Sequence, residues 1–591
     1  MGSCKIARRT VLGAGAATAA GLVSGSSSAD SGRHRQPTVA AVPLPLLFHS
    51  PTLQPYVDEL PIPPQRGLGG TVVIGEALHQ FHRDLAPARS WGYAGATHLG
   101  PTFIARRGEN IPTVFDNQLQ DHIFANDIDL SHHGTCAIDL LVPPVSVHLH
   151  GAPNAPEHDG NAMDLFRPGT SRVYEFNNDI QACTLWLHDH AMGNTRLNVY
   201  GGLATQYWVR DEWDTGAADN PLGLPSGDFE IPLTIQDKMF WDDGMPRFYA
   251  TPTVPRNWWQ GGFCGDVMCV NGKVWPNLNV DRGLYRFRLL NGSSLNTYTF
   301  YFSNRMNFHV IGTDGGLLDT PVPTHQLTVG VGERFDILVD FSGVVPGTQL
   351  QLLNDEQIVW AGQMLGSKMI PNIMQFTVQD KTGFQGPVPT TLRGGVGQPE
   401  KLPALEQPTF VRHSTLNWLL DTRIPFSDMN INNMRYEDES VETPVQGRIE
   451  QWDFINNSPW DHTMHLHLVQ FRIIGRQDYW PLLYIFFNPP PPRKGKRWAP
   501  PADRFKRKRP MDRPLQVEDG WKDTVRCPPG QITRILVRFP TADELGFDPD
   551  RVFGWDELGW PLQGYGWHCH IMDHEDHEMM LRYRLVAPEQ E

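Results

Sequence analysis

Four short segments of this chain hold closely spaced histidines, and one of them also holds a cysteine. They are His148-Leu149-His150, His188-Asp189-His190, His462-Thr463-Met464-His465-Leu466-His467, and His568-Cys569-His570 with His574 and Met579 downstream. Residues two apart on a β-strand point to the same face, so each His-x-His pair directs two imidazoles the same way. Neutral imidazole suits copper, zinc, iron or nickel. Four such pairs exceed the needs of one ion and predict a cluster of two or three.

Cys569 lies between two of these histidines, so on a strand its sulfur points to the opposite face. There it would meet His462, His574 and Met579. Two histidines, a thiolate and a distant thioether are the ligands of a blue-copper electron-transfer site. Because the cysteine is covalently adjacent to histidines of the cluster, electrons would pass along a few backbone bonds from the first metal to the second site.

The alternative for any single His-x-His pair is a surface or hydrogen-bonded polar pair without metal. Four pairs, one of them around a cysteine, make that alternative the weaker one. Isolated histidines in polar stretches, His132, His133 and His158, are interpreted as solvated residues and not as ligands.

The elements that must position these side chains are short β-strands. Apolar runs are short or alternating, as in Thr71 to Ile74, Val145 to His150 and Ile532 to Val537, and Gly 55 and Pro 50 are both abundant. No long amphipathic helix stands out. With 591 residues, two to four domains are expected. The pattern predicts an all-β protein.

Polar, Pro/Gly-rich breaks divide the chain into three pieces, each of a size suited to one β-sandwich or barrel. The breaks lie near Asp214 to Gly227 and Gly386 to Leu405. The predicted domains are 40–213, 228–385 and 406–591, with 386–405 as a linker.

The last domain has an unusual insert, 479–518, with Pro489-Pro490-Pro491-Pro492 and basic clusters at Arg493 to Arg497 and Lys506 to Arg509. We expect it to be a surface loop over the cysteine-containing site, where it would shape access of the electron donor. Its apolar run Tyr484 to Phe487 either lines a substrate groove or packs beneath the insert, and packing is the favoured interpretation.

The first residues predict export. Arg8-Arg9 precedes a small-residue apolar run from Gly13 to Val23, and Ser27-Ser28-Ala29 is a suitable cleavage point, so 1–29 is interpreted as a signal of the twin-arginine type. The alternative is a disordered tail with two adjacent arginines. The net charge of −15 argues against nucleic acid as a partner, and no later stretch is long enough to span a bilayer. Oligomeric state, and whether Cys264 and Cys269 form a disulfide, stay open.

At the histidine segments the chain resembles the multicopper oxidase family, and the resemblance covers nearly its whole length. Within the family it is most similar to the branch of bacterial spore-coat laccases, bilirubin oxidases and phenoxazinone synthases. The segments that carry this likeness are His79 to Leu85, Trp186 to Met192, Thr195 to Tyr200 and His574 to Met580. The resemblance implies three cupredoxin-like Greek-key β-barrel domains, with a trinuclear copper cluster between the first and the third.

The resemblance also implies four coppers and a role for each ligand. A type 1 copper would be held by His462, Cys569 and His574, with Met579 axial. The type 2 copper would take His148 and His465. One type 3 copper would take His150, His188 and His568, and the other would take His190, His467 and His570.

Two acids match family positions. Asp159 follows the first histidine motif and Glu575 follows the type 1 histidine. Carboxylates near the cluster would relay protons to dioxygen, or would only orient a ligand.

The implied activity is one-electron oxidation of phenols or o-aminophenols coupled to four-electron reduction of O2 to water. The partners are then a small aromatic reductant and O2. A second hypothesis is a cuprous or ferrous ion oxidase, which would need a Met-rich loop or an acidic access site. With 17 methionines and no Met-rich insert it ranks lower. A third is a copper-binding or coat protein without turnover.

Overall fold

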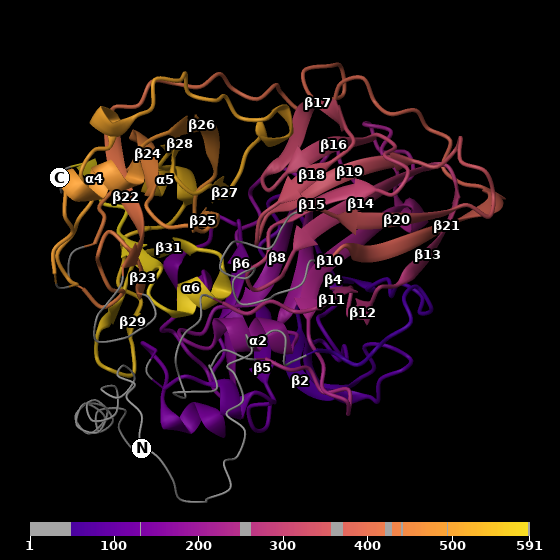
Figure 1. Ribbon diagram of the computed structural model, residues 1–591, viewed down its shortest axis with the longest axis horizontal. Helices are drawn as coiled ribbons and strands as arrows, with labels where there is room; N and C mark the ends of the chain where they lie inside the picture. Colours follow the sequence, from indigo (N-terminus) through magenta and orange to yellow (C-terminus); the bar gives the residue numbers. More distant parts are fainter. Residues whose placement is uncertain are drawn as a thin grey trace, which may run out of the picture.

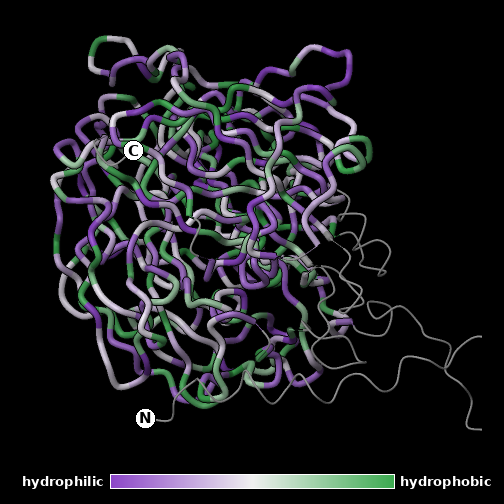
Figure 2. The backbone as a smooth tube through the Cα atoms, turned by 90° about the vertical axis from the view of Figure 1, so that its left-hand side faces the viewer, coloured by the Kyte–Doolittle hydropathy of each residue, from purple (hydrophilic) through white to green (hydrophobic). Residues whose placement is uncertain are grey.

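The computed structural model describes residues 49–130, 132–248, 262–355, 370–419, 428–438, 441–492 and 494–588. The predicted signal, 1–29, lies outside the described residues. Strands predominate and group by sequence into three units, each built on two main sheets, and the third unit has an additional two-stranded sheet, β29-β30. In the tube of Figure 2, apolar and polar stretches alternate along most of the chain, as expected for short strands with one buried face.

The first unit contains a five-stranded sheet in the order β1-β4-β9-β8-β6 and a four-stranded sheet β3-β2-β5-β7. Its core is built around Trp91, Phe115 and Tyr207. The elements are β1 (Gln65–Gly67), β2 (Thr71–His79), β3 (Ala88–Tyr93), β4 (Thr102–Arg106), β5 (Thr113–Asn117), β6 (Val147–His150), β7 (Thr170–Tyr174), β8 (Cys183–Asp189), α2 (Thr195–Gly201) and β9 (Ala204–Arg210).

The second unit has a seven-stranded sheet β12-β11-β10-β14-β19-β16-β17 and a five-stranded sheet β13-β21-β20-β15-β18. Phenylalanines such as Phe287, Phe300 and Phe376 fill the space between the sheets. The elements are β10 (Glu230–Lys238), β11 (Val267–Val270), β12 (Lys273–Val274), β13 (Asn277–Arg282), β14 (Leu284–Asn291), β15 (Tyr298–Phe302), β16 (Phe308–Thr313), β17 (Gly316–Thr324), β18 (Leu327–Val329), β19 (Arg334–Asp340), β20 (Gln349–Asn354) and β21 (Asn372–Thr382).

The third unit has sheets β23-β22-β24-β28-β26 and β27-β25-β31-β32, with Trp452 and Trp567 in the core between them. The elements are β22 (Phe410–Leu419), β23 (Asp428–Ile431), β24 (Ile449–Asn456), β25 (His462–Leu466), β26 (Phe471–Asp478), α4 (Pro481–Phe487), β27 (Thr524–Cys527), β28 (Gln531–Arg538), α5 (Ala542–Leu545), β29 (Gly554–Trp555), β30 (Pro561–Leu562), β31 (Tyr565–Cys569), α6 (Met572–Asp576) and β32 (Met580–Tyr583). We keep 40–213, 228–385 and 406–591 as the proposed domain limits.

The three units meet around one seam. In Figure 1 the third unit (orange to yellow) lies on the left, the second (magenta to salmon) on the right, and the first (indigo to purple) below and between them. Strands β6 and β8 of the first unit end beside β31 and α6 of the third. The histidine segments are therefore brought to this seam by strand ends from two units.

The insert of the third unit contains a short helix, α4, which begins with Pro481 at its first position. Tyr484 is buried against Tyr479 and Trp498. Phe486 and Phe487, in contrast, are exposed. The prediction that the whole run packs beneath the insert is thus wrong for its second half, because a helix places residues 484 and 486 on different faces. Within the described residues, no helix is both long and apolar enough to cross a membrane.

Candidate metal centre

One group of buried ligand atoms is formed by His462, Cys569 and His574. Nδ1 of His462 lies 3.3 Å from Sγ of Cys569 and 3.2 Å from Nδ1 of His574, and the Cys569 Sγ to His574 Nδ1 distance is 3.7 Å. Nε2 of His462 lies 2.6 Å from the hydroxyl of Ser458, which leaves Nδ1 facing the sulfur. The predicted type 1 ligands therefore converge on one point.

Met579 lies beside this group through its backbone. Its N–H donates to the carbonyl of His574, and its carbonyl accepts from the N–H of Cys569. Its side chain is buried in the same apolar cluster as Cys569. Burial raises the pKa of the Cys569 thiol and lowers the pKa of His462, so without a cation both groups are neutral. A soft cation that displaces the thiol proton fits this donor set.

The eight remaining histidines form three sets whose ligand atoms lie within 4.8 Å of one another in each set. Strand register explains the contact, because His148 on β6 is opposite His188 on β8, and His465 on β25 is opposite His568 on β31. The sets are His148, His150 and His465; His150, His188 and His570; and His190, His467 and His568.

Imidazoles from the first and third units stack across the seam. The ring centroids of His150 and His465 are 3.6 Å apart, and those of His148 and His467 are 4.0 Å apart. Nε2 of His148, His188 and His465 is buried without a hydrogen-bond partner. Burial and neighbouring histidines lower the pKa of all these rings, so they are neutral ligands. Unpartnered buried nitrogens that face one another are what a cluster of cations would satisfy.

Two of the predicted type 3 ligands exchange places. His568 Nε2 lies 3.3 Å from His190 Nε2 and 3.2 Å from His467 Nε2, whereas His570 Nε2 lies 3.1 Å from His150 Nδ1. His570 therefore belongs with His150, and the sequence-based assignment of this pair is wrong. Strand alternation places His568 and His570 both at the cluster, as observed, but it does not determine which of the two neighbouring sets each one joins.

Known proteins are similar to this chain over most of its length. Family models described as multicopper oxidase match residues 138–213, 246–348 and 399–589. The chain is 34% identical to a laccase of Bacillus stratosphericus over 89% of this chain and 98% of that protein. It is 32% identical to a laccase of Bacillus subtilis (strain 168), over 91% and 99% respectively.

The chain belongs to the multicopper oxidase family.

A solved structure agrees in fold. McoA multicopper oxidase of Aquifex aeolicus superposes with a TM-score of 0.68 at 24% identity, over 91% of this chain and 100% of that one. The three two-sheet units are thus the three cupredoxin-like domains of this fold. The protein is a laccase-like copper oxidoreductase with dioxygen as oxidant, and the family implies one type 1, one type 2 and two type 3 coppers. The donor sets described above fit them.

Asp159 contacts two ligands of this multicopper oxidase. Its carboxylate Oδ2 lies 2.7 Å from Nδ1 of His467, and its backbone carbonyl accepts from Nδ1 of His148. Burial raises the pKa of Asp159 well above its usual range. The contacts orient both rings with Nε2 toward the cluster, so the structure gives Asp159 a positioning role, while proton relay by this residue stays a prediction.

Glu575 is fully buried between two ligands from different domains. Its carboxylate lies 3.0 Å from Nδ1 of His568 and 3.6 Å from Nε2 of His190. Burial raises the pKa of Glu575 to about 7, so the group can both hold and release a proton near neutral pH.

Replacing Glu575 by glutamine is expected to lower kcat by about 10²-fold or more, the usual contribution of general acid–base catalysis. The glutamine keeps the shape of the side chain, so copper content and the type 1 absorption band should be unchanged. Oxygen uptake at saturating donor measures the effect. Loss of copper together with activity would instead assign Glu575 to ligand positioning alone.

Asp523 is a site residue that spacing did not reveal. Its carboxylate lies 2.9 Å from Nε2 of His150, and its backbone carbonyl lies 2.8 Å from Nδ1 of His465. Arg334, on β19 of the second domain, holds this carboxylate with two bonds of 2.6 and 2.5 Å. Asp523 lies far in sequence from every histidine motif, and the only signal is the acid itself next to Lys522.

The second domain supplies further buried charges to the same place. Lys522 lies 3.0 Å from Asp314 and 3.0 Å from Glu333, both in the second domain. All of these side chains are fully or almost fully buried. The second domain, whose described residues belong to none of the histidine groups, thus fixes the segment that contacts His150 and His465.

His132 contradicts the expectation of a solvated residue. It is buried, and its Nδ1 lies 3.2 Å from the guanidinium of Arg196, which in turn pairs with Asp576 at 3.0 Å. Arg196 comes from α2 of the first domain and Asp576 from α6 of the third. The polar stretch around His132 is therefore folded against the seam between these domains.

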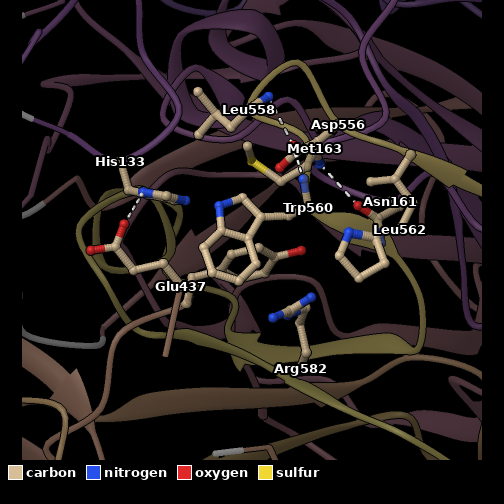
Figure 3. A pocket seen from close by; sticks show the side chains of 11 residues that line it. His133, Asn161, Met163, Glu437, Asp556, Leu558, Trp560, Leu562 and Arg582 are labelled. Atoms are coloured by element: carbon tan, nitrogen blue, oxygen red, sulfur yellow. Dashed lines mark hydrogen bonds and ion pairs between the residues drawn. The ribbon is translucent and has the colours of Figure 1, made fainter. Parts of the chain in front are cut away.

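A small pocket opens at the same seam (Figure 3). Tyr436, Trp560 and Met163 line it together with Arg582 and His133, and Glu437 lies 3.4 Å from His133. Its lining residues Tyr436 and Leu562 pack with Met580, whereas the adjacent Met579 packs in the core around the type 1 group. The pocket therefore lies on the side of Met580, away from the type 1 group. For this reason we do not assign the electron donor to it.

Proposed function

We propose that this multicopper oxidase takes single electrons from phenols or o-aminophenols at the type 1 site and reduces O2 to water with four of them. Four donor molecules each lose an electron and a proton, and one O2 takes up four of each to give two waters. Copper supplies the one-electron redox chemistry when bound. The protein holds the ligands, excludes water from them and positions the acids.

The covalent link between the two sites supports turnover over storage. Cys569 of the type 1 group is flanked in sequence by His568 and His570, which lie in the two type 3 sets. All three side chains are buried. A copper-storage protein does not need a thiolate ligand joined by backbone bonds to a separate histidine cluster.

The observation that carries the aromatic donor is the state of the carboxylates that flank the type 1 histidines. Asp461 pairs with Arg526 at 2.5 Å, Asp573 accepts a hydrogen bond from the backbone of Phe263, and Glu575 lies on the cluster histidines. An oxidase for metal ions needs carboxylates available to bind the incoming cation. Each of these groups already has one carboxylate oxygen in contact with a protein donor, which favours an uncharged organic donor.

The insert lies beside the type 1 region, which supports a role in donor access. The N–H of Trp498 donates to the carbonyl of Asn432, and that of Gly495 donates to the carbonyl of Asn433. The hydroxyl of Tyr479 donates to the carbonyl of Asn456, two residues before Ser458.

Shortening the insert is expected to change the ranking of donors, measured as kcat/KM for a series of substituted phenols. Equal loss for every donor would count against this role.

Oxygen uptake with copper-loaded protein separates the candidate functions. We expect turnover with 2-aminophenol and 2,6-dimethoxyphenol to exceed turnover with cuprous or ferrous ion by at least about tenfold in kcat/KM, a difference of about 1.4 kcal/mol in transition-state binding. Faster oxidation of either metal ion would assign the protein to the metal-ion oxidases. Bound copper without oxygen uptake from any donor would leave only the storage or coat function.

A further inference from the structure

Helix α4 presents an apolar face to solvent. Leu482 and Phe486 are 84% and 75% exposed, and Leu483 and Phe487 are also exposed. Leu482 is four residues from Phe486, and Leu483 is four residues from Phe487. Residues four apart are neighbours on a helix surface, so the two adjacent pairs form one continuous strip. Trp480, just before the helix, is half exposed beside them. Such a group of large apolar side chains on a folded surface marks an interaction site.

The helix is held in place from its other face. Tyr484 is fully buried, and its hydroxyl donates to the carbonyl of Pro500 over 2.6 Å. Its ring packs edge-on against Phe505 and Tyr479, at centroid distances of 5.5 and 5.9 Å. The exposed strip is therefore a fixed surface. Helix α4, which carries it, lies at the left-hand margin of Figure 1, the side that faces the viewer in Figure 2.

A basic segment runs beside this strip. The N–H of Trp480 donates to the carbonyl of Phe505, and the N–H of Arg507 donates to the carbonyl of Asp478. The guanidinium of Arg507 lies 4.2 Å from the ring centroid of Trp480. These contacts place residues 504–509, with the sequence Arg-Phe-Lys-Arg-Lys-Arg, along the edge of α4.

The charge of the insert opposes that of the whole chain. From 479 to 518 there are ten Lys and Arg residues against three Asp and Glu, although the net charge of the protein is −15. Lys506 pairs with Asp503, and Arg509 pairs with Asp512. In the part of the chain that the structure describes, Arg504, Arg507 and Lys508 have no carboxylate partner and remain available to an external anion.

We propose that α4 and residues 504–509 form a docking surface for an anionic lipid bilayer. The side chains of Leu482, Phe486 and Phe487 would enter the interface between headgroups and acyl chains, while Arg504, Arg507 and Lys508 bind lipid phosphates. An apolar strip bordered by Lys and Arg is the arrangement that places a helix in the plane of a membrane surface. The protein would then be peripheral and would not span the bilayer.

Two other occupants fit the surface less well. A second copy of the chain that docked through the same surface would bring one basic border against another, which is repulsive. A soluble polyanion would use the basic residues but would leave Phe486 and Phe487 in water. Only a surface that is both anionic and apolar uses all of these side chains.

Sedimentation of the full copper-loaded chain with vesicles tests the proposal. With vesicles that contain phosphatidylglycerol we expect binding that weakens as salt rises, because the basic side chains are exposed. Vesicles of phosphatidylcholine alone should bind at least about tenfold more weakly. Equal binding to both kinds of vesicle, or binding to neither, would overturn the proposal.

Two sets of substitutions divide the surface into its components. Phe486→Ser with Phe487→Ser, and Arg504→Gln with Arg507→Gln and Lys508→Gln, should each weaken binding, the second by about 100-fold for three lost charges. Trp555→Ser is the matched control, because Trp555 is an equally exposed aromatic residue on β29. The type 1 absorption band should be unchanged in all variants, which shows that each has folded.

Competition and light scattering identify the other occupants. If a soluble polyaspartate binds as tightly as the vesicles, and the double phenylalanine variant binds as well as the parent chain, the site is one for polyanions and the proposal fails. It also fails if the chain dimerises through Phe486 and Phe487 and does not bind vesicles.

Discussion

Replacing Cys569 by serine is expected to abolish the intense absorption of the type 1 site and to lower donor oxidation by more than about 10³-fold, as removal of an essential member of a catalytic set does. The sulfur is the only atom of the residue that can be a soft ligand for copper, and His462 and His574 face it at 3.3 and 3.7 Å. The variant should keep the copper of the cluster, whose ligands are histidines. Absorption, copper content and oxygen uptake are the measurements.

Cys527→Ala is the matched control. Cys527 is also fully buried and lies opposite His462 in the β25–β27 ladder, but it belongs to none of the ligand groups. Its replacement should cost stability and leave the absorption band in place. If Cys569→Ser retained the band, or if Cys527→Ala lost it, the assignment of the type 1 ligands would be incorrect.

Replacing Asp523 by asparagine is expected to release copper from the cluster and to leave the type 1 site filled. The asparagine no longer forms the ion pair with Arg334, so the side chain that accepts from His150 loses its restraint and Arg334 becomes an uncompensated buried charge. Outer-sphere partners of this kind contribute about 10–100-fold to metal affinity. Dioxygen reduction should fall with the cluster copper. Copper per chain and the type 1 band, measured on one sample, distinguish this result from general unfolding.

Arg334→Met tests the same contact from the second domain. It leaves the carboxylate of Asp523 buried without its cation, which costs about 3–5 kcal/mol of stability and removes the restraint on His150. Arg286→Met is the control, because Arg286 is equally buried in the same domain but pairs with Asp214 and Asp336, away from the cluster. Both variants should unfold at lower temperature, and only Arg334→Met should lose cluster copper. Equal copper retention would contradict the positioning role.

The strand spacing of the histidines predicted the ligand groups because it depends on local geometry alone. His148 and His150 share a face of β6, and Cys569 turns away from His568 on β31. The same rule placed both His568 and His570 at the cluster, but it could not tell which of the two neighbouring sets each one joins. Alternation predicts the face of a side chain and not its partners across a domain boundary.

No sequence pattern predicted which residues contact one another across the domain boundaries. Asp523 and Arg334 are 189 residues apart, and neither lies in a histidine motif. His132 was interpreted as solvated because its neighbours are polar, yet Arg196 and the third domain cover it. The apolar run at Tyr484 to Phe487 revealed hydrophobicity but not which residues face outward, because that depends on what lies beneath the helix.

The ion pair between Arg334 and Asp523 makes metal retention depend on a domain whose described residues belong to none of the metal-binding groups. Local opening of the second domain would free Asp523, and with it the orientation of His150 and His465, before any ligand-bearing strand had separated. Damage to this domain by heat or proteolysis would therefore cause loss of copper from the seam between the other two domains. In this protein, a full copper content therefore indicates that all three domains are intact.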